Sequence, residues 1–250
     1  MDLELEGKRA LVTGASVGIG RAIAARLARE GVKLAIMARR GALLEELASE
    51  IAAAGGTKPA IILQDMMAPD AAKRIADAAL AALGTVEILV NNAGGSRPLP
   101  VDAEEQRWDE ALTLNFHRPR QLTTALLPQM VAGRWGRVIC ITGKSEPDRI
   151  NAAFAAKAGI HSWAKGLSRE VGKHGITVNS IAPGRIISEQ ILRLYPEEER
   201  KRHAAAEIPV GEYGQPDDLA VLAAFLASPL ARYITGTVIP VDGGLRRYQF

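Results

Sequence analysis

The sequence predicts an α/β protein of one domain, in which a doubly wound parallel sheet of about seven strands carries helices on both faces. Three observations indicate this class. Apolar runs of strand length alternate with alanine-rich helical stretches for most of the chain. A glycine-rich turn joins the first strand to the first helix. The 250 residues, 48% of them hydrophobic, can bury a sizeable core in one domain.

Residues 11–20 contain this turn, and the rest of the fold is organised around it. They read Leu-Val-Thr-Gly-Ala-Ser-Val-Gly-Ile-Gly, an apolar strand that passes through a T-G-x-x-x-G-x-G pattern into a helix. Glycines let the backbone approach a phosphate closely, and the free N–H groups at a helix start attract anions. We therefore expect a phosphate-binding turn, and the alternative is an ordinary tight turn between strand and helix. The expected contacts are Gly14, Ser16, Gly18, Ile19 and Gly20.

This turn resembles that of the short-chain dehydrogenase/reductase family, and later motifs extend the resemblance over essentially the whole chain. The sequence Asn-Asn-Ala-Gly at 91–94 and the Pro-Gly pair at 183–184 each follow an apolar run, as in the family. The resemblance implies a Rossmann-like fold, a nicotinamide dinucleotide cofactor, and hydride transfer that interconverts a carbonyl and an alcohol. Small-molecule carbonyls or alcohols would then be the substrates.

The second strand, at 33–37, ends in Ala38, Arg39 and Arg40. In dinucleotide folds an acid about 20 residues past the glycines holds the ribose of NAD, whereas an arginine suits the 2′-phosphate of NADP. Arg39 stands at this distance, and the hydroxyl of Ser16 could add a hydrogen bond. The sequence thus favours NADP(H) over NAD(H), unless the arginines only cap a strand in water.

Three further elements gain expected roles from the resemblance. Asp65, after the strand at 59–63, would contact the adenine, or it is a solvated loop acid. The residues after the strand at 86–90 would let the cofactor ribose pack against the backbone, and they are Asn91, Ala93 and Gly94. Asn115, in a long helix from about 104 to 130, would hold a water that relays protons to the catalytic lysine; otherwise it faces solvent.

The catalytic pattern is incomplete. After the strand at 136–141 the family carries a serine pair and then Tyr-x-x-x-Lys on the next helix. Lys157, followed by alanine and glycine, matches the family lysine, which also binds the cofactor ribose. Ala153 occupies the tyrosine position. Thr142 aligns with the serine pair, and Ser145 lies slightly further into the loop.

A positioned acid or base contributes roughly 10²- to 10⁴-fold in rate, or about 3–5 kcal/mol of barrier. Without the tyrosine hydroxyl, the sequence predicts a slow enzyme or a different proton route. Lys157 could act directly or through a water, and a substrate hydroxyl could also serve. The other candidates are Ser145, Lys144, Asp148 and Tyr195.

The C-terminal part supplies the expected substrate region. Pro183 and Gly184 form the turn after the strand at 175–184, and both are expected to contact the cofactor. Ser188 stands four residues after Gly184, where the family has a threonine. The resemblance also implies that the backbone of Ile187 lies near the carboxamide group of the nicotinamide. Residues 186–212 are rich in charge and are expected to form a mobile substrate lid.

Three arginines in loops at the expected active-site end suggest an anionic substrate, unless they are merely solvated. They are Arg97, Arg149 and Arg185. The family resemblance also implies a homotetramer or dimer, assembled through the helix near 104, the helix with Lys157 and the last strand, at 234–244.

Composition excludes several other classes. The net charge is only +3, with 31 basic and 28 acidic residues interspersed, which argues against nucleic acid as a partner. We expect a cytoplasmic protein without a membrane partner, because no signal-like start and no run of 18 apolar residues occur. The four histidines have no metal-ligand spacing, so we expect no metal, and the single cysteine, Cys140, is expected to be a buried thiol.

Two other functions stay open. The chain could bind NADP without turnover, as a sensor or scaffold. Alternatively, the same site could catalyse a dehydration or an isomerisation.

Overall fold

The computed structural model describes residues 1–143 and 149–248, which form one parallel sheet in the order β3-β2-β1-β4-β5-β6-β7. All adjacent strands pair in parallel. The doubly wound sheet predicted from the sequence is therefore confirmed. Its order reverses between β1 and β4, where sheets of this kind bind ligands. The strands are β1 (Arg9–Thr13), β2 (Lys33–Ala38), β3 (Ala60–Leu63), β4 (Ile88–Asn91), β5 (Gly136–Ile141), β6 (Ile176–Pro183) and β7 (Val238–Val241).

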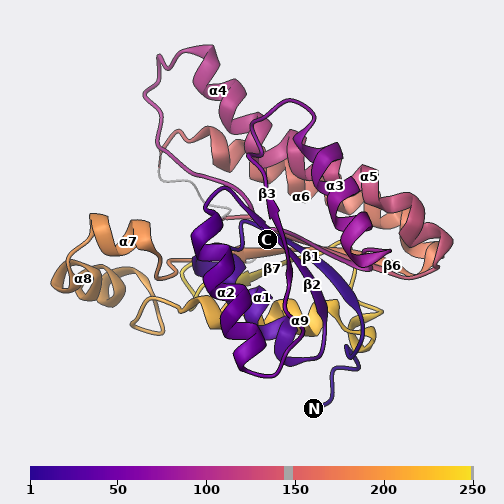
Figure 1. Cartoon of the computed structure of the whole chain (residues 1–250). Helices are drawn as coiled ribbons and strands as arrows, with labels where there is room; N and C mark the ends of the chain where they lie inside the picture. The colour runs from indigo at the N-terminus through magenta and orange to yellow at the C-terminus, as the bar shows by residue number, and fades with distance from the viewer. Residues whose placement is uncertain (144–148, 249–250) are drawn as a thin grey trace.

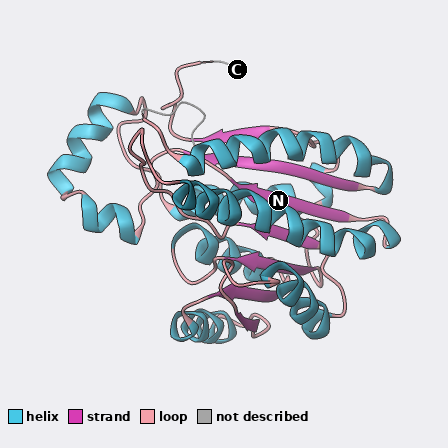
Figure 2. Ribbon diagram, turned by 90° about the horizontal axis from the view of Figure 1, so that it is seen from above, coloured by secondary structure: helices cyan, strands magenta, loops and turns pink. Residues whose placement is uncertain are grey.

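Helices cover both faces of this sheet (Figures 1 and 2). On one face α1 (Gly18–Arg29), α2 (Gly41–Ala53) and α9 (Pro216–Ala227) enclose one apolar cluster. On the other, α3 (Ala71–Leu83), α5 (Arg118–Ala132) and α6 (Ala152–Val171) enclose a second. The shorter elements are α4 (Glu105–Leu112), η1 (Thr113–His117), η2 (Gly172–His174), α7 (Glu189–Leu194), α8 (Glu197–Glu207) and η3 (Pro229–Ala231).

The strands are apolar along their length because both of their faces are covered. In β1, Ala10 and Val12 join the first cluster, whereas Leu11 joins the second. In β4, Ile88 and Val90 likewise point away from Leu89. Side chains in a strand alternate between faces, so a parallel strand buried on both sides needs apolar residues at consecutive positions.

The long helix expected from about 104 to 130 is interrupted by a π-helical segment. Thr113–His117 form this segment, η1, between α4 and α5. Pro119 follows it, and a proline lacks the N–H that would complete the α-helical bond to residue 115. π-helical turns of this kind often mark functional sites.

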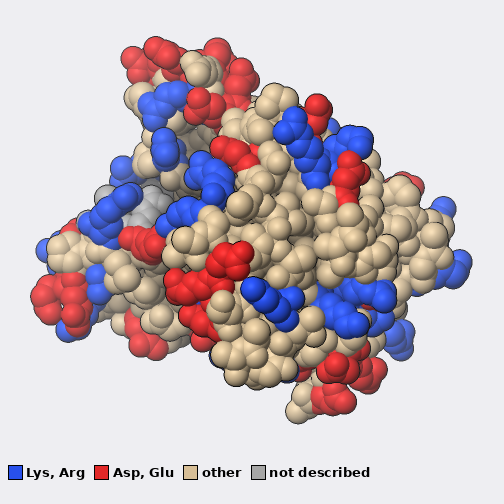
Figure 3. Space-filling model, viewed as in Figure 1, with Lys and Arg blue, Asp and Glu red and all other residues tan. Residues whose placement is uncertain are grey.

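Residues 186–212, the expected lid, contain helices α7 and α8. Helices α7 and α8 project from the side of the sheet (Figure 1). Acidic side chains gather over this projection and over α4 at the top of the view, and basic side chains lie between the two (Figure 3).

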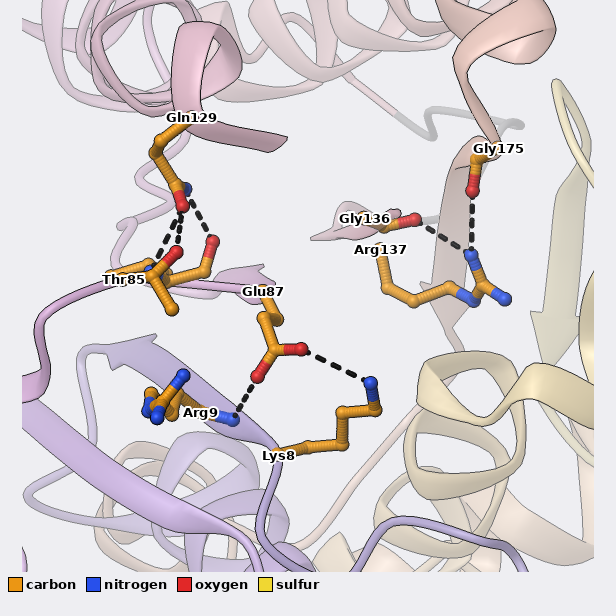
Figure 4. Close-up of polar contacts among 9 residues, drawn as sticks. Lys8, Arg9, Thr85, Glu87, Gln129, Gly136, Arg137 and Gly175 are labelled. Carbon is orange, nitrogen blue, oxygen red and sulfur yellow. Dashed lines mark hydrogen bonds and ion pairs between the residues drawn. The ribbon is translucent and has the colours of Figure 1, made fainter. Parts of the chain in front are cut away.

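Separate groups of polar contacts join neighbouring strands at their amino-terminal ends (Figure 4). Glu87, just before β4, accepts hydrogen bonds from Lys8 Nζ at 3.0 Å and from the Arg9 N–H at 3.1 Å. Arg137 in β5 is buried and donates to the carbonyls of Gly136 and Gly175 at 2.8 and 3.1 Å. These bonds lie at the edge opposite to the glycine-rich turn.

Among the described residues, no helix is both long enough and apolar enough to cross a membrane. Within the same residues, no group of three or more His, Cys, Asp or Glu side chains is placed to hold a metal ion.

Candidate functional site

The turn between β1 and α1 is tightly folded around its glycines. Gly14 and Gly18 adopt positive φ values of 68° and 57°, a region that side chains disfavour. A Cβ atom on Gly20 would lie 2.4 Å from the carbonyl oxygen of Gly14, so only glycine fits there. Asn92 Nδ2 holds the turn from β4 by donating to the carbonyls of Thr13 and Gly14 at 3.0 and 3.1 Å.

The start of α1 is suited to bind an anion. Within the described residues no side chain caps this helix, whose first turn begins Gly-Ile-Gly-Arg. A Cβ on Gly18 would meet no atom within 4 Å, so space is open beside it. Uncapped N–H groups and the positive end of the helix dipole face this space. The turn therefore fits a dinucleotide pyrophosphate.

A large pocket of about 1330 Å³ runs along the carboxyl ends of the strands from this turn to the lid. It lies where open α/β sheets bind ligands. Most residues that the sequence assigns to the cofactor line it: Gly14, Ser16, Gly18, Ile19, Arg39, Asp65, Ala93, Gly94, Lys157, Pro183, Gly184 and Ser188. Of the described candidates, Gly20, Asn91 and Ile187 do not line this pocket.

Two arginines after β2 lie at one end of the pocket in different environments. Arg39 is largely exposed and pairs with Asp65, with Nη1 3.9 Å from Oδ2. Arg40, which the sequence assigned no contact, donates from Nη2 to Ser16 Oγ at 3.5 Å. Its Nη1 also pairs with Glu189 Oε2 of α7 at 3.1 Å.

The two asparagines after β4 point in different directions. Asn91 is buried and donates to Thr123 Oγ1 at 2.9 Å and to Cys140 Sγ at 3.8 Å. Its side chain therefore braces the sheet against α5 and β5, away from the pocket. Asn92 is the member of the pair that reaches the glycine-rich turn. The alternation of side chains along an extended chain accounts for this division.

Cys140 is a buried free thiol, as the sequence suggests. Burial raises its pKa to about 12, so it stays protonated and unreactive at neutral pH.

Lys157 lies in the wall of the pocket at the end of β5. Its Nζ donates to the carbonyl oxygen of Thr142 at 2.9 Å. Burial lowers the pKa of this amine to about 8, because the charged form loses its hydration. Near neutral pH, Lys157 can therefore either release or accept a proton.

His161 packs behind this amine and was missed in the sequence. Its Nε2 lies 2.8 Å from Thr142 Oγ1, which also donates to the Ile181 carbonyl at 3.1 Å. Burial, together with the charges of Lys157 and Arg246, lowers the pKa of His161. The spacing of four residues from Lys157 was the available signal, because such residues share a helix face.

The first turn of α6 carries no hydroxyl group beside Lys157. Ala153 is buried and its N–H donates to the side chain of Asn151, which caps the helix. Asn151 and Phe154 line the pocket together with Lys157, whereas Ala153 does not. Asn151 Nδ2 also donates to Ser96 Oγ at 2.8 Å.

Asn115 lies within the π-helical segment and is buried. Its Oδ1 accepts the N–H of Gly95 at 3.1 Å, and its Nδ2 donates to the Ala111 carbonyl at 2.9 Å. A Cβ on Gly94 would lie 2.8 Å from Oδ1, so this glycine lets the two segments approach. Asn115 thus faces the loop after β4 and not solvent.

The polar groups of Ser188 and Ile187 already have partners within the chain. Ser188 Oγ accepts the N–H of Ile191 at 3.2 Å and caps α7. The N–H of Ile187 donates to the Gly214 carbonyl at 2.9 Å.

The three loop arginines do not act together. Arg149 and Arg185 line the pocket, whereas Arg97, although described, does not. Arg185 pairs with Glu207 of α8, with Nε 3.1 Å from Oε2, so a carboxylate already offsets its charge. Of the proton-donor candidates, Tyr195 lines the pocket. Lys144, Ser145 and Asp148 lie outside the described residues.

The fold and the glycine-lined pocket together define a dinucleotide-binding α/β protein. Residues 14–246 match the family described as Enoyl-(Acyl carrier protein) reductase. The chain is 37% identical over 248 residues to the 3-oxoacyl-[acyl-carrier-protein] reductase FabG of Pseudomonas aeruginosa, covering 97% of this chain and 99% of that relative. This chain therefore belongs to the short-chain dehydrogenase/reductase family.

Solved structures with the same fold are similar over nearly the whole chain. One is the L-sorbose reductase of Gluconobacter frateurii complexed with NADPH and L-sorbose, with a TM-score of 0.95, 28% identity, and coverage of 99% and 100% of the two chains. Another is a 7α-hydroxysteroid dehydrogenase complexed with NADH and 7-oxoglycochenodeoxycholic acid, with a TM-score of 0.91, 31% identity, and coverage of 97% and 96%.

Proposed function

We propose that this chain is an NADP(H)-dependent reductase of small-molecule carbonyls, or the corresponding alcohol dehydrogenase, with Lys157 in place of the usual tyrosine as acid and base. The observation that carries the proposal is the Lys157 amine. It lies in the wall of the same pocket as the glycine-rich turn, and its pKa of about 8 suits proton transfer near neutral pH. The relatives reported above are reductases and a dehydrogenase, and two of their structures hold NADPH or NADH.

The preference for NADP(H) rests on the end of the pocket beside β2. Two guanidinium groups and the Ser16 hydroxyl lie together there, and they suit the 2′-phosphate that NADP carries and NAD lacks. One solved relative binds NADPH and another binds NADH, so the relatives do not decide the preference.

The bound nicotinamide would supply the hydride to the carbonyl carbon. As the carbonyl π bond breaks, Lys157 Nζ gives a proton to the oxygen, which yields the alcohol and a neutral amine. Solvent then returns the proton to the amine. The Thr142 carbonyl holds Nζ in place, and Thr142 Oγ1 is itself fixed between His161 and Ile181.

We assign positioning roles to the neighbouring groups. Asn115 holds the loop after β4 through Gly95, next to the pocket wall. We also propose that residues 186–212 cover the substrate, because Ile186, Ile191 and Tyr195 line the pocket beyond the cofactor turn. The proposal of an anionic substrate depends chiefly on Arg149, which lines the pocket, because Glu207 already pairs with Arg185.

A Lys157→Met variant tests the proton donor. We expect its kcat for NADPH-dependent ketone reduction to fall roughly 10²- to 10⁴-fold. In the wild type, the rate of reduction should fall as pH rises through about 8, since only the ammonium form donates, and alcohol oxidation should rise over the same interval. The measurement is the absorbance of the reduced nicotinamide across a panel of ketones and alcohols.

Lys165→Met is the matched control, because Lys165 is an exposed lysine on the same helix that does not line the pocket. Its rates and pH profile should equal those of the wild type. A wild-type profile without a change near pH 8, or a Lys157→Met variant with normal turnover, would contradict the assignment.

Ala153 favours one other function, which is cofactor binding without turnover. No hydroxyl stands at this buried position to act as an acid. Tight binding of NADPH by the wild type, with no turnover across the same panel, would support this second function over the first.

A further inference from the structure

The lid is tied to the cofactor end of the pocket by one bridge of three side chains. Arg40 lies between them, immediately before α2. Its Nη2 donates to Ser16 Oγ in the glycine-rich turn at 3.5 Å. Its Nη1 donates to both carboxylate oxygens of Glu189, at 3.1 and 3.4 Å. All three residues line the pocket, and α7 projects on the side where α2 lies (Figure 1).

Glu189 is held in place for this contact. It is the first residue of α7, directly after Ser188, whose hydroxyl caps the helix. A carboxylate in the first turn of a helix is stabilised by the helix dipole. Glu189 therefore places a negative charge at the end of the pocket where the proposed function requires a phosphate.

The guanidinium of Arg40 cannot bind a phosphate and the Glu189 carboxylate equally well. A phosphate suits the planar fork of an arginine well and carries more charge than a carboxylate. The phosphate and the Glu189 carboxylate would also repel each other across the short distance that Arg40 spans. NAD(H), which has no 2′-phosphate, leaves the bridge undisturbed.

We propose that Glu189 is a specificity-determining residue, whose carboxylate competes with the 2′-phosphate of NADP(H) for Arg40. The phosphorylated coenzyme binds by displacing this carboxylate and releases the start of α7 from the cofactor end of the pocket. The lid thus responds to the identity of the coenzyme. The inference rests on the proposed NADP(H) function, but it makes a separate prediction.

The test compares coenzyme affinities of a Glu189→Gln variant with those of the wild type. An exposed ion pair contributes about 0.2–1 kcal/mol, so removing the competing charge should tighten NADPH binding about 1.4- to fivefold. NADH binding should be unchanged. The same contrast should appear between adenosine 2′,5′-bisphosphate and 5′-AMP, which occupy the adenosine end alone. Fluorescence titration or calorimetry measures the four dissociation constants without turnover.

Two further variants sharpen the result. Glu198→Gln removes an exposed carboxylate from α8, where it pairs with Lys201 away from the pocket, and should change neither affinity. In an Arg40→Gln background, which has already lost the shared guanidinium, Glu189→Gln should no longer tighten NADPH selectively.

The outcomes separate a failure of this inference from a failure of the proposed function. Selective tightening of the phosphorylated ligands supports the inference. Equal effects on both coenzymes, no effect, or weaker NADPH binding would overturn it while the proposed function stands. If neither coenzyme saturates the wild type, the proposed function itself fails.

Discussion

At position 153 a methyl group is buried one helical turn before the Lys157 amine. The adjacent Phe154 lines the pocket but has no titratable oxygen. This turn of α6 therefore places an apolar surface where the proposed reaction needs a proton donor. Lys157 is left as the titratable group of α6 that lines the described pocket, which makes the chemistry at this residue the most informative to alter.

Ala153→Tyr should restore a hydroxyl beside Lys157. We expect the variant to raise ketone reduction at least tenfold, because a phenol beside an ammonium group is a better-placed acid than the amine alone. Steady-state kcat with NADPH is the measurement. The tyrosine ring can overpack the buried site and lower the free energy of unfolding by about 1–3 kcal/mol, so the thermal midpoint Tm is recorded as well.

Ala153→Phe separates the hydroxyl from the ring. It imposes the same crowding without a proton donor, and its kcat should not exceed that of the wild type. If the tyrosine and phenylalanine variants fold and have equal activity, the pocket does not position a substrate carbonyl near residue 153.

Sequence reasoning located the strand ends correctly but could not resolve neighbouring side chains. Residue type and spacing placed Arg39 near the 2′-phosphate region, where it lines the pocket, but did not distinguish its role from that of Arg40, which contacts Ser16. They also placed Asn91 and Asn92 after β4, but did not show that Asn91 bonds to Thr123 while Asn92 reaches the turn. In both pairs one step along the backbone reverses the direction of the side chain, which no composition or motif encodes.

At the scale of single elements, the interrupted helix shows a second limit. Periodicity predicted one long helix, because a π segment of five residues is too short to interrupt the apolar pattern of the flanking α-helices. The π turn lies at Thr113–His117 and carries Asn115, whose side chain bonds to Gly95. Pro119 was visible in the sequence and was the available signal, since it removes one helical hydrogen bond.

The lid helices were also beyond a sequence reading. Residues 186–212 were assigned a function without a secondary structure, because α8 is strongly charged and has one buried side chain in its described residues, that of Ala204. A helix stabilised mainly by charge pairs and a few contacts leaves little apolar periodicity to read.

Arg137 in β5 connects several elements of the fold, so its substitution tests how much these contacts stabilise the protein. Its buried guanidinium donates to the carbonyls of Gly136 and Gly175 (Figure 4). It also donates to the carbonyl of Ser228, and so joins β5 to the start of β6 and the end of α9. It also lies 4.4 Å from the ring centre of Trp135. Burial lowers its pKa to about 10, so the charge persists at neutral pH.

Arg137→Met should therefore reduce the free energy of unfolding by about 2–4 kcal/mol, because it leaves buried carbonyls without donors. Tm should fall by roughly 5–15 °C in calorimetry or circular dichroism. Lys33→Met, at the exposed start of β2, is the control and should stay within about 0.5 kcal/mol of the wild type. A normal Tm for Arg137→Met would show that water satisfies these carbonyls.

For the whole molecule, the sequence predicted the sheet and the position of the pocket, but not the contacts between distant segments. Apolar runs and the glycine-rich turn predicted the parallel sheet, because a strand that is covered by helices on both faces needs apolar residues at consecutive positions. The pocket could be placed at the carboxyl ends of the strands because open α/β sheets bind ligands there. Contacts between distant segments could not be predicted, and the bridge from Ser16 through Arg40 to Glu189 is such a case.

Assembly into a homotetramer or dimer stays a prediction. Of the three elements expected to take part, β7 pairs with β6 on one side, and several of its residues are only half-buried in the single chain. Such an edge can accept a second copy, as strand edges generally can.

Calorimetric titration of the wild-type protein with NADPH, NADP⁺, NADH and NAD⁺ tests the central claim, that the pocket at the carboxyl ends of the strands holds a nicotinamide dinucleotide beside Lys157. We expect saturable binding of one coenzyme per chain, tighter for the phosphorylated pair. The absence of saturation with all four coenzymes would contradict the account.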